Sequence, residues 1–352
     1  MIYLICQDYI NTTNNHAGIK YLCKEIEARN PSLFKTYVMP YFLDQTKVSK
    51  YKLIRYIEYK IADLRHKKYV QKFSKEFLGQ ISAADVVIIM EYMDMSYMFY
   101  SLVKEIKQKD KNTRIFGMVH LVPQKLEKAF PNKLFLDWAL SVDKIITLGT
   151  SLTNYFIEKG VPKQRVHTTF HYVDSYYSRV DDDVCDIERL KVIAMGNQMR
   201  NIELLHRIVN DNPQVDFIIC QGVNHFEYLF KKTSNVKLIP FVPENELREY
   251  MSESDVSLNV MDDTIGSNVI VTSMAMGLTM ICSDVGSIRD YCDESNCVFC
   301  NNDDKDSFSK AIDLLSRNKT LCKKMKGESV RLSKRLTIDN FIKDILSLTK
   351  IN

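Results

Sequence analysis

The chain has 352 residues, of which 45% are hydrophobic and 26% charged, with 11 glycines and 8 prolines. This composition excludes a disordered or fibrous protein, and at roughly 100–200 residues per domain the length favours two domains. No run of about 18 apolar residues occurs, which excludes a membrane-spanning helix. Residues 1–180 carry 27 Lys and Arg against 17 Asp and Glu, so the net charge of +4 divides into +10 and −6.

Near-continuous apolar runs alternate with helical patterns through the first half of the chain. Runs of this length are typical of strands buried on both faces of a parallel sheet. The strands are expected at residues 1–6, 84–90, 114–120 and 144–148. The helices between them are expected at residues 17–29, 97–109 and 151–159. The order predicts a βαβ series.

The segment 47–72 is basic and rich in aromatic and aliphatic residues. From Lys47 to Lys72 it holds nine Lys or Arg against Glu58 and Asp63. A basic amphipathic stretch can lie on an anionic membrane, gaining about 1 kcal/mol per basic residue near the surface. A solvated helix and a nucleic-acid-binding surface fit the same pattern. No nucleic-acid motif supports the last, so the preferred hypothesis is peripheral binding to an anionic membrane surface.

His120 stands at the end of the apolar run 114–120. Ligands of parallel sheets bind at the carboxyl ends of strands, so we expect this side chain to face the space between the two domains. An isolated histidine is more often structural, but the place at the strand end favours a functional role. Such a role would be positioning and charge, without a nucleophilic triad.

A second series follows the polar, Asp-rich stretch 176–187, which is the expected linker. Strands are expected at residues 190–195, 215–220, 236–240, 256–260 and 279–282. Helices are expected at residues 201–210, 244–252, 268–276 and 338–349. Two doubly wound α/β domains are therefore predicted, with the active site between them.

Nine cysteines are scattered mostly through apolar runs, and no signal peptide precedes the first strand. We therefore expect reduced thiols and a cytoplasmic location. Cys297 and Cys300 form a C-x-x-C pattern, but neither a second pair nor a histidine lies at zinc-ligand spacing. The expectation is a short buried strand and no metal site.

A phosphate-binding helix start is predicted after the strand 256–260. Gly266 permits a tight turn, and Ser267 or Asn268 can cap the helix that follows. The free N–H groups of a first helical turn, together with the helix dipole, suit a diphosphate. A glycine and a serine that only cap the helix would give the same pattern.

The stretch 264–290 resembles the donor-binding segment of family 4 retaining glycosyltransferases. The positions that fall in step with that family are Met274, Ala275, Gly277, Asp284, Gly286 and Asp290. The resemblance implies the GT-B fold, an α/β architecture of two doubly wound Rossmann-like domains facing across a cleft. Residues 1–180 are then the acceptor-binding domain and residues 188–335 the nucleotide-sugar-binding domain. Residues 336–352 form a helix that crosses back to the first domain.

The resemblance also carries over individual site residues. In the second domain, Gly196, Arg200 and Asn201 correspond to a phosphate-binding loop, and Phe241 and Val242 to a loop that grips the nucleobase. A simple turn with proline at a helix start would give the same sequence at Phe241 and Val242. In the first domain, Gly18 corresponds to a loop near the donor phosphate. His120 corresponds to the histidine beside the sugar and is the candidate catalytic residue.

Two glutamates of the family, eight residues apart, are replaced here by Thr264 and Thr272. A threonine hydroxyl is shorter than a carboxylate and uncharged, and a charged acceptor makes a hydrogen bond roughly twice as strong as a neutral one. Asp262 and Asp263 stand beside the first position, either as a substitute for the missing carboxylate or as loop caps.

The expected function is transfer of a sugar from a nucleotide-diphosphate sugar to a glycan or lipid-linked acceptor in cell-surface polysaccharide synthesis. The expected enzyme is a retaining glycosyltransferase without metal or cofactor, located in the cytoplasm or at the inner face of the membrane. The double loss at Thr264 and Thr272 keeps a second hypothesis open, a catalytically degenerate GT-B protein that binds a partner or a glycan. A sugar-nucleotide epimerase on the same scaffold is the third.

Overall fold

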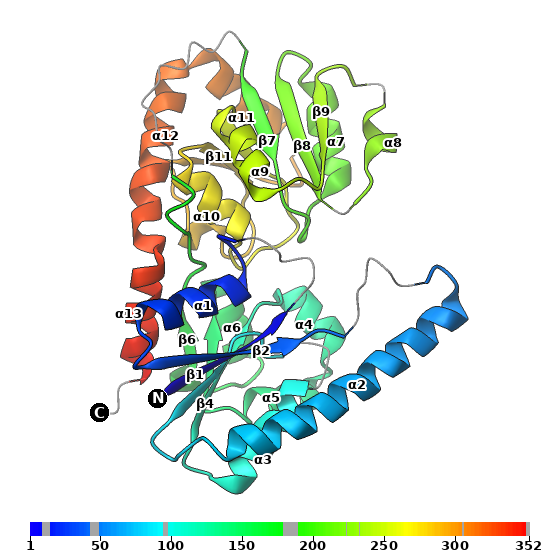
Figure 1. Ribbon diagram of the computed structural model, residues 1–352. Helices are drawn as coiled ribbons and strands as arrows, with labels where there is room; N and C mark the ends of the chain where they lie inside the picture. The colour runs from blue at the N-terminus through cyan, green and yellow to red at the C-terminus, as the bar shows by residue number, and fades with distance from the viewer. Residues whose placement is uncertain are drawn as a thin grey trace. The chain divides into compact units, whose positions relative to one another are not determined.

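The computed structural model describes residues 1–8, 15–42, 49–93, 98–178, 189–222, 224–231, 233–304 and 306–349. The chain divides into two compact units (Figure 1). Unit 1 comprises Met1–Thr169 and Asp344–Asn352, and unit 2 comprises Phe170–Lys343. Each unit is a six-stranded parallel sheet with helices around it, so the predicted α/β fold with two Rossmann-like domains is confirmed.

Unit 1 is built on the sheet β2-β1-β3-β4-β5-β6. Its strands are β1 (Ile2–Asp8), β2 (Phe34–Pro40), β3 (Val86–Ile89), β4 (Arg114–Val119), β5 (Lys144–Thr147) and β6 (Val166–Thr168). Its helices are α1 (Ile19–Arg29), α2 (Lys52–Leu78), α3 (Met98–Lys109), α4 (Pro123–Ala129), α5 (Asn132–Ala139), α6 (Thr150–Glu158) and the short η1 (Lys163–Arg165). The chain leaves β1 toward one edge of the sheet and returns to β3 on the other side. The switch point where ligands bind in such sheets therefore lies between β1 and β3.

The core of unit 1 includes Trp138, the single tryptophan of the chain. It is fully buried in α5 and stacks on Tyr100 with ring centroids 4.7 Å apart. The rings of Phe130 and Tyr92 also pack against the indole, with centroid distances of 5.1 and 5.6 Å. All four aromatic residues belong to unit 1, so this cluster reports on one unit alone.

Helix α2 is the longest helix described, with 27 residues. Its second half packs on unit 1 through its buried residues, which begin at Ala62 and include Phe73 and Phe77. Its first half extends away from the sheet of the same unit (Figure 1). Residues 52–72 of the basic segment fall on this helix and residues 49–51 precede it, whereas Lys47 and Val48 lie outside the described residues.

Unit 2 is built on the sheet β12-β11-β10-β7-β8-β9. Its strands are β7 (Lys191–Ala194), β8 (Asp216–Gly222), β9 (Val236–Pro240), β10 (Val256–Asn259), β11 (Thr279–Ser283) and β12 (Cys297–Cys300). Its helices are α7 (Ile202–Asp211), α8 (Glu227–Phe230), α9 (Glu244–Ser252), α10 (Asn268–Ala275), α11 (Ser307–Arg317) and α12 (Lys319–Ser333), with the short helices η2 (Ile288–Asp290) and η3 (Lys334–Leu336). The strand order places the switch point between β7 and β10.

A buried ion pair fixes the end of the unit 2 sheet where β7 and β10 begin. Lys326 of α12 donates to Asp255 at 2.6 Å, and the other oxygen of Asp255 accepts the backbone N–H of Lys191 at 3.0 Å. Both charged side chains are almost fully buried. Removing one partner of such a pair leaves an uncompensated charge, so these residues act as a unit.

The C-terminal helix α13 (Ile338–Thr349) has the bounds expected from the sequence and spans the division between the units. Within unit 1, Asp344 accepts a hydrogen bond from His167 at 2.9 Å. In the same unit, Arg114 donates to the carbonyl of Thr349 at 2.9 Å. These two contacts attach the end of the chain to β4 and β6.

The expected linker 176–187 falls mostly outside the described residues, but its beginning is described and belongs to unit 2. Tyr177 is buried there, and its hydroxyl donates to the carboxylate of Glu244. Burial, with this carboxylate beside it, raises the pKa of Tyr177. At the start of the Asp-rich stretch, Tyr177 therefore packs within unit 2.

Cys297 and Cys300 form the ends of β12 and are both buried, so the predicted short buried strand is confirmed. Within the part of the chain that the structure describes, no group of three His, Cys, Asp or Glu residues is arranged to hold a metal ion. None of the described helices is both long and apolar enough to cross a bilayer.

Candidate functional site

Three loops meet at the switch point of unit 2. They follow the carboxyl ends of β7, β10 and β11 and contain residues 195–201, 260–267 and 284–287. Backbone hydrogen bonds join the first two: Asn201 donates to Val260 at 3.0 Å, and Asp262 donates to Met199 at 2.8 Å. Met199 takes the left-handed conformation, with φ of 53°. A non-glycine residue held there is strained, which is common at binding sites.

Arg200 lies in the first of these loops and carries a buried guanidinium group. One nitrogen, Nη1, donates to the carbonyl of Cys220 at 3.0 Å, whereas Nη2 is buried without a hydrogen-bond partner. Arg200 makes no ion pair with any residue that the structure describes. Burial lowers its pKa to about 10. A desolvated cation with an unused N–H is poised to receive an anion, and a diphosphate would supply both charge and acceptor oxygens.

The start of α10 provides a second group of donors. Gly266 has φ of +95°, and a Cβ built on it would lie 2.3 Å from the ring of Tyr291. Ser267 is the N-cap and accepts from the N–H of Ile270 at 3.3 Å, and Asn268 is the first helical residue. The first turn of α10 therefore exposes the positive end of its dipole at the switch point, as an anion site requires.

Gly196 brings the first loop against this helix start. Its φ is +76°, and a Cβ there would lie 2.8 Å from a side-chain methyl carbon of Val269. Only glycine permits both the backbone conformation and this close approach. The loop with Arg200 and the first turn of α10 are thus assembled into one site.

Thr264 and Thr272, where the resemblance implies glutamates, use their hydroxyls inside the site. Thr264 is buried, and its hydroxyl accepts from the N–H of Gly266 at 3.1 Å. Thr272 is also buried and donates to the carbonyl of Asn268 at 2.6 Å. These hydrogen bonds shape the loop and the first turn of α10. Neither threonine supplies a carboxylate at the switch point.

The two neighbouring aspartates have different positions. Asp262 is exposed and accepts from the side-chain amide of Asn201 at 2.8 Å. Asp263 is half-buried, accepts from the N–H of Thr264 at 2.8 Å, and lies against Gly286. Burial raises the pKa of Asp263. Asp263 is therefore the carboxylate that the fold keeps beside the position of the first missing glutamate.

Both polar atoms of the Asn201 side-chain amide make structural contacts. The oxygen caps α7 by accepting from the N–H of Leu204 at 2.9 Å, and the amide nitrogen donates to Asp262. Asn201 thereby ties the first loop to the second, beside Arg200.

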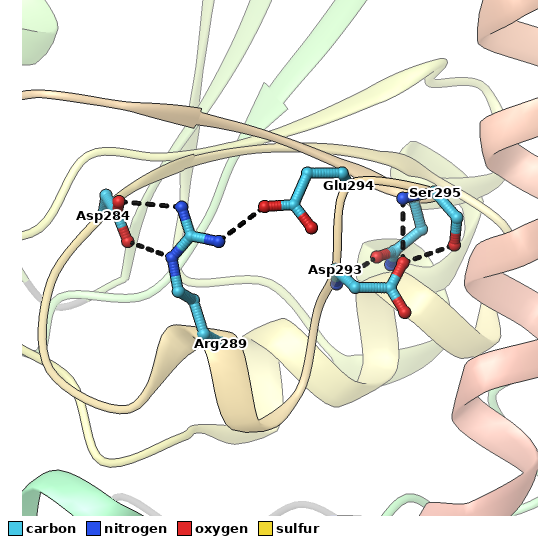
Figure 2. A network of polar contacts seen from close by, with 6 residues as sticks. Asp284, Arg289, Asp293, Glu294 and Ser295 are labelled. Atoms are coloured by element: carbon cyan, nitrogen blue, oxygen red, sulfur yellow. Dashed lines mark hydrogen bonds and ion pairs between the residues drawn. The ribbon is translucent and has the colours of Figure 1, made fainter.

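The third loop is held by an ion network around Arg289 (Figure 2). Arg289 binds both oxygens of Asp284, at 2.8 and 2.9 Å, and reaches Glu294 at 2.6 Å. Its guanidinium also lies over the ring of Phe299, 4.0 Å from the centroid. A bidentate arginine–carboxylate pair fixes orientation as well as charge. Asp284, one of the motif positions, thus has a structural partner on its own loop.

Tyr291 joins this loop to the helix start. Its buried hydroxyl accepts from the N–H of His171 at 2.8 Å and lies 3.5 Å from the carbonyl of Ile265. Burial raises the pKa of Tyr291, so the phenol stays neutral. Sequence reasoning missed Tyr291, because its partner His171 is distant in the chain and no sequence motif links the two residues.

Phe241 and Val242 follow β9 and precede α9, on the same edge of the unit 2 sheet. Phe241 is 56% exposed, and Val242 is half-buried. An exposed aromatic ring at the carboxyl edge of a sheet is available for stacking on a planar ligand group.

In unit 1, His120 directly follows β4. Its Nε2 lies 2.7 Å from the carbonyl oxygen of Met90, which can only accept, so Nε2 carries the proton. Burial lowers the pKa of His120 to about 4. The imidazole is therefore neutral near pH 7, and its second nitrogen is an acceptor.

Gly18 precedes α1 with φ of +88°, a backbone conformation that other residues rarely adopt. Gln7 is the last but one residue of β1, near the switch point of unit 1, and sequence reasoning did not single it out. The Gln7 side chain is 1% exposed, and neither its amide nitrogen nor its oxygen is paired with any described residue. The backbone N–H of Gln7 donates to the carboxylate of Glu91, just beyond β3, at 2.7 Å.

Comparisons with known proteins agree with this architecture. Residues 192–318, within unit 2, match the sequence model of the family Glycosyl transferases group 1. The whole chain superposes on solved GT-B structures. One is sucrose-phosphate synthase from Thermosynechococcus elongatus, with a TM-score of 0.77, 13% identity, and 99% of this chain and 98% of that chain covered. No curated protein matches the sequence.

Two further structures are similar over nearly their full lengths. Anabaena HepE in complex with UDP and glucose gives a TM-score of 0.72 at 11% identity, covering 98% of each chain. The lipopolysaccharide outer core galactosyltransferase WaaB, in its apo form, gives 0.70 at 14% identity, covering 99% of this chain and 100% of that one. At these identities the likeness establishes the fold.

The fold is therefore GT-B, and the switch point of unit 2 lies within the segment that matches Glycosyl transferases group 1. The predicted resemblance to a GT-B glycosyltransferase of group 1 is confirmed.

Proposed function

We propose that the chain is a glycosyltransferase that binds a nucleotide-diphosphate sugar at the switch point of unit 2. The observation that carries the proposal is the buried, partly unpaired guanidinium of Arg200 in a loop packed against the start of α10. The family match of residues 192–318 and the titles of HepE with UDP and of the galactosyltransferase WaaB support it.

In the proposed reaction Arg200 and the first turn of α10 hold the diphosphate. As the bond between sugar and phosphate breaks, negative charge grows on the leaving diphosphate, and these groups stabilise that charge from fixed positions. Phe241 stacks on the nucleobase, and Val242 lies beside it. Charge stabilisation by the protein itself is the basis for proposing that no metal or cofactor is required.

The acceptor is proposed to be a glycan or a lipid-linked sugar bound by unit 1, in cell-surface polysaccharide synthesis. His120 would position the acceptor hydroxyl as a neutral hydrogen-bond acceptor, since the low pKa keeps it unprotonated. Retention of anomeric configuration follows from the resemblance to family 4, and proton NMR of the product tests it. Work at the inner face of a membrane would suit a lipid-linked acceptor.

Calorimetric titration with UDP and a panel of nucleotide sugars tests the donor site. We expect UDP to bind the unmodified chain, Arg200→Gln to lose most of that binding, and His120→Asn to bind normally but transfer sugar slowly. Absence of binding by any nucleotide or nucleotide sugar would overturn the proposal. Equal loss of binding in both variants would overturn the assigned roles.

A second candidate function is a GT-B protein that has kept donor or glycan binding without catalysis. Its basis is that Thr264 and Thr272 are engaged inside the site where the family has glutamates. Slow hydrolysis of a bound nucleotide sugar distinguishes the two, because the enzyme is expected to release free sugar. Conversion of the donor to an epimer without acceptor would instead identify the third hypothesis.

A further inference from the structure

Helix α2 carries a surface that sugar transfer does not use. None of residues 52–61 is buried, although they form more than two turns of regular helix. Most helices of a globular domain bury one face, because tertiary packing supplies most of their stability. Among the described residues, none packs on the first half of α2 closely enough to bury a side chain there.

Five aliphatic side chains form what we call the apolar ridge: Leu53, Ile54, Ile57, Ile61 and Leu64. Leu53 is 73% exposed, Leu64 is 58% exposed, and the other three are 46–49% exposed. Leu53, Ile57, Ile61 and Leu64 recur at the spacing of one helical face.

The apolar ridge faces away from the core of its own unit. At about 100° per residue, it lies half a turn around the axis from the face that contains Phe73 and Phe77. Contiguous exposed aliphatic side chains of this kind mark an interaction surface, whereas single ones are ordinary.

Basic side chains border the apolar ridge. Lys60, Arg65 and Lys68 are exposed and make no ion pair with a described residue, whereas Lys67 pairs with Asp63 at 2.8 Å. Residues 50–72 carry eight Lys or Arg against two acidic residues, a net charge of 8 − 2 = +6. An apolar stripe between rows of cationic side chains is complementary to acyl chains below anionic phosphates.

We propose that α2 binds an anionic lipid bilayer, with the apolar ridge in the acyl region and the flanking cations at the lipid phosphates. A nucleic acid would neutralise the cations but leave the aliphatic ridge in water. A second copy of the helix would bring two surfaces of charge +6 together. The inference is independent of the proposed sugar transfer, because it concerns only where unit 1 binds.

Two variants, each with one added tryptophan, test which face of α2 inserts. Ile57→Trp lies on the apolar ridge, and Tyr59→Trp lies on the opposite face of the same helix turn. The native Trp138 is buried and contributes a constant background. With vesicles containing about 30% phosphatidylglycerol in phosphatidylcholine, we expect a blue shift and quenching by brominated acyl chains for Ile57→Trp and little change for Tyr59→Trp.

Vesicle flotation tests the charge. Each basic residue near an anionic surface strengthens binding about fivefold, so Lys60→Gln/Arg65→Gln/Lys68→Gln should weaken binding about 100-fold. The matched control is Lys128→Gln/Lys133→Gln/Lys163→Gln, which removes three exposed lysines elsewhere on unit 1. We expect this control to weaken binding much less.

Several results would overturn the inference: no binding to anionic vesicles, equal responses of the two tryptophans, equal loss in the two triple variants, or tighter binding of homopolymeric RNA than of vesicles. A titration with UDP on the same preparations separates the two proposals. A chain that binds UDP but not vesicles contradicts only the bilayer inference, and the reverse contradicts only the donor site.

Discussion

The switch points of the two sheets are alike in topology, but the residues that the structure describes there differ in chemistry. In unit 2 the strand ends bring together an arginine with a buried, unpaired nitrogen, the start of α10 and three glycines with positive φ. In unit 1 the corresponding edge has a neutral histidine and a buried glutamine amide, with the Glu91 carboxylate on the backbone of Gln7.

This difference indicates which ligand each sheet is suited to bind. A site with a desolvated cation and a helix dipole selects a phosphate, whereas a carboxylate with neutral donors and acceptors suits hydroxyl groups. The total charge would predict the opposite, because residues 1–180 are the basic half of the chain and the anion site lies in the acidic half. Local burial at the strand ends therefore matters more for ligand choice than the total charge of a domain.

The largest effect is expected at Arg200. Arg200→Met should weaken UDP binding about 100-fold, because a charge-assisted hydrogen bond and an opposite charge are lost together. Removing an uncompensated buried cation should at the same time raise the free energy of unfolding by about 1 kcal/mol. Calorimetry and urea denaturation measure the two quantities, with Arg200→Lys as an intermediate control. Weaker binding with an equal loss of stability would mean that Arg200 is only structural.

Gly266→Ala should lower the free energy of unfolding by about 3 kcal/mol. The alanine Cβ would combine a strained φ with a collision against the Tyr291 ring. The matched control is Gly327→Ala in α12, where a Cβ meets nothing within 4 Å and helix propensity favours alanine by about 1 kcal/mol. If both substitutions changed the free energy of unfolding in the same direction, the backbone at Gly266 would not be essential for the start of α10.

The neutral state of His120 predicts a pH dependence in unit 1. Its pKa is about 4 when folded and about 6.5 when unfolded, so the unfolded chain binds more protons between these values. The free energy of unfolding should therefore fall as pH is lowered from 6.5 to 4, by up to about 3 kcal/mol, and stay constant above 6.5. The difference between the unmodified chain and His120→Asn isolates this contribution. If this difference in the free energy of unfolding did not change with pH, the imidazole of His120 would be in contact with water.

The smallest expected effect compares two buried glutamines. Gln7→Met should raise the free energy of unfolding by about 1 kcal/mol, since no described group pairs with that amide. Gln221→Met in unit 2 should lower it by about as much, because the side chain of Gln221 accepts from Phe226 at 2.7 Å. Chemical denaturation of the two variants measures both changes in the free energy of unfolding. A loss for Gln7→Met would show that its amide has a structural partner, such as an ordered water.

Elements whose pattern depends on the nearest residues were predictable. The helix after Pro243 and the C-terminal helix have the expected bounds, because capping and apolar periodicity are local. The strand β2 was not predicted, since Phe34–Pro40 lacks a continuous apolar run. Residues 52–72 of the basic segment belong to a helix that continues to Leu78, whose later residues pack on unit 1.

The candidate site was predictable only as a list of positions. The helix start after Gly266 follows from local chemistry, and the structure gives Ser267 the cap. The unpaired nitrogen of Arg200 depends on where β8 ends, and the role of Tyr291 depends on His171, which is 120 residues away. Such contacts exist only after the chain has folded, and no spacing encodes them.

The position of Trp138 gives the molecule an optical label for one of its halves. Because the only tryptophan is buried within unit 1, its emission follows the melting of that unit and does not sense unit 2. A nucleotide that stabilises unit 2 should raise the temperature of the fluorescence transition only if the two units melt as one cooperative block. If they melt separately, calorimetry should show two peaks, and the nucleotide should move only the peak that fluorescence does not report.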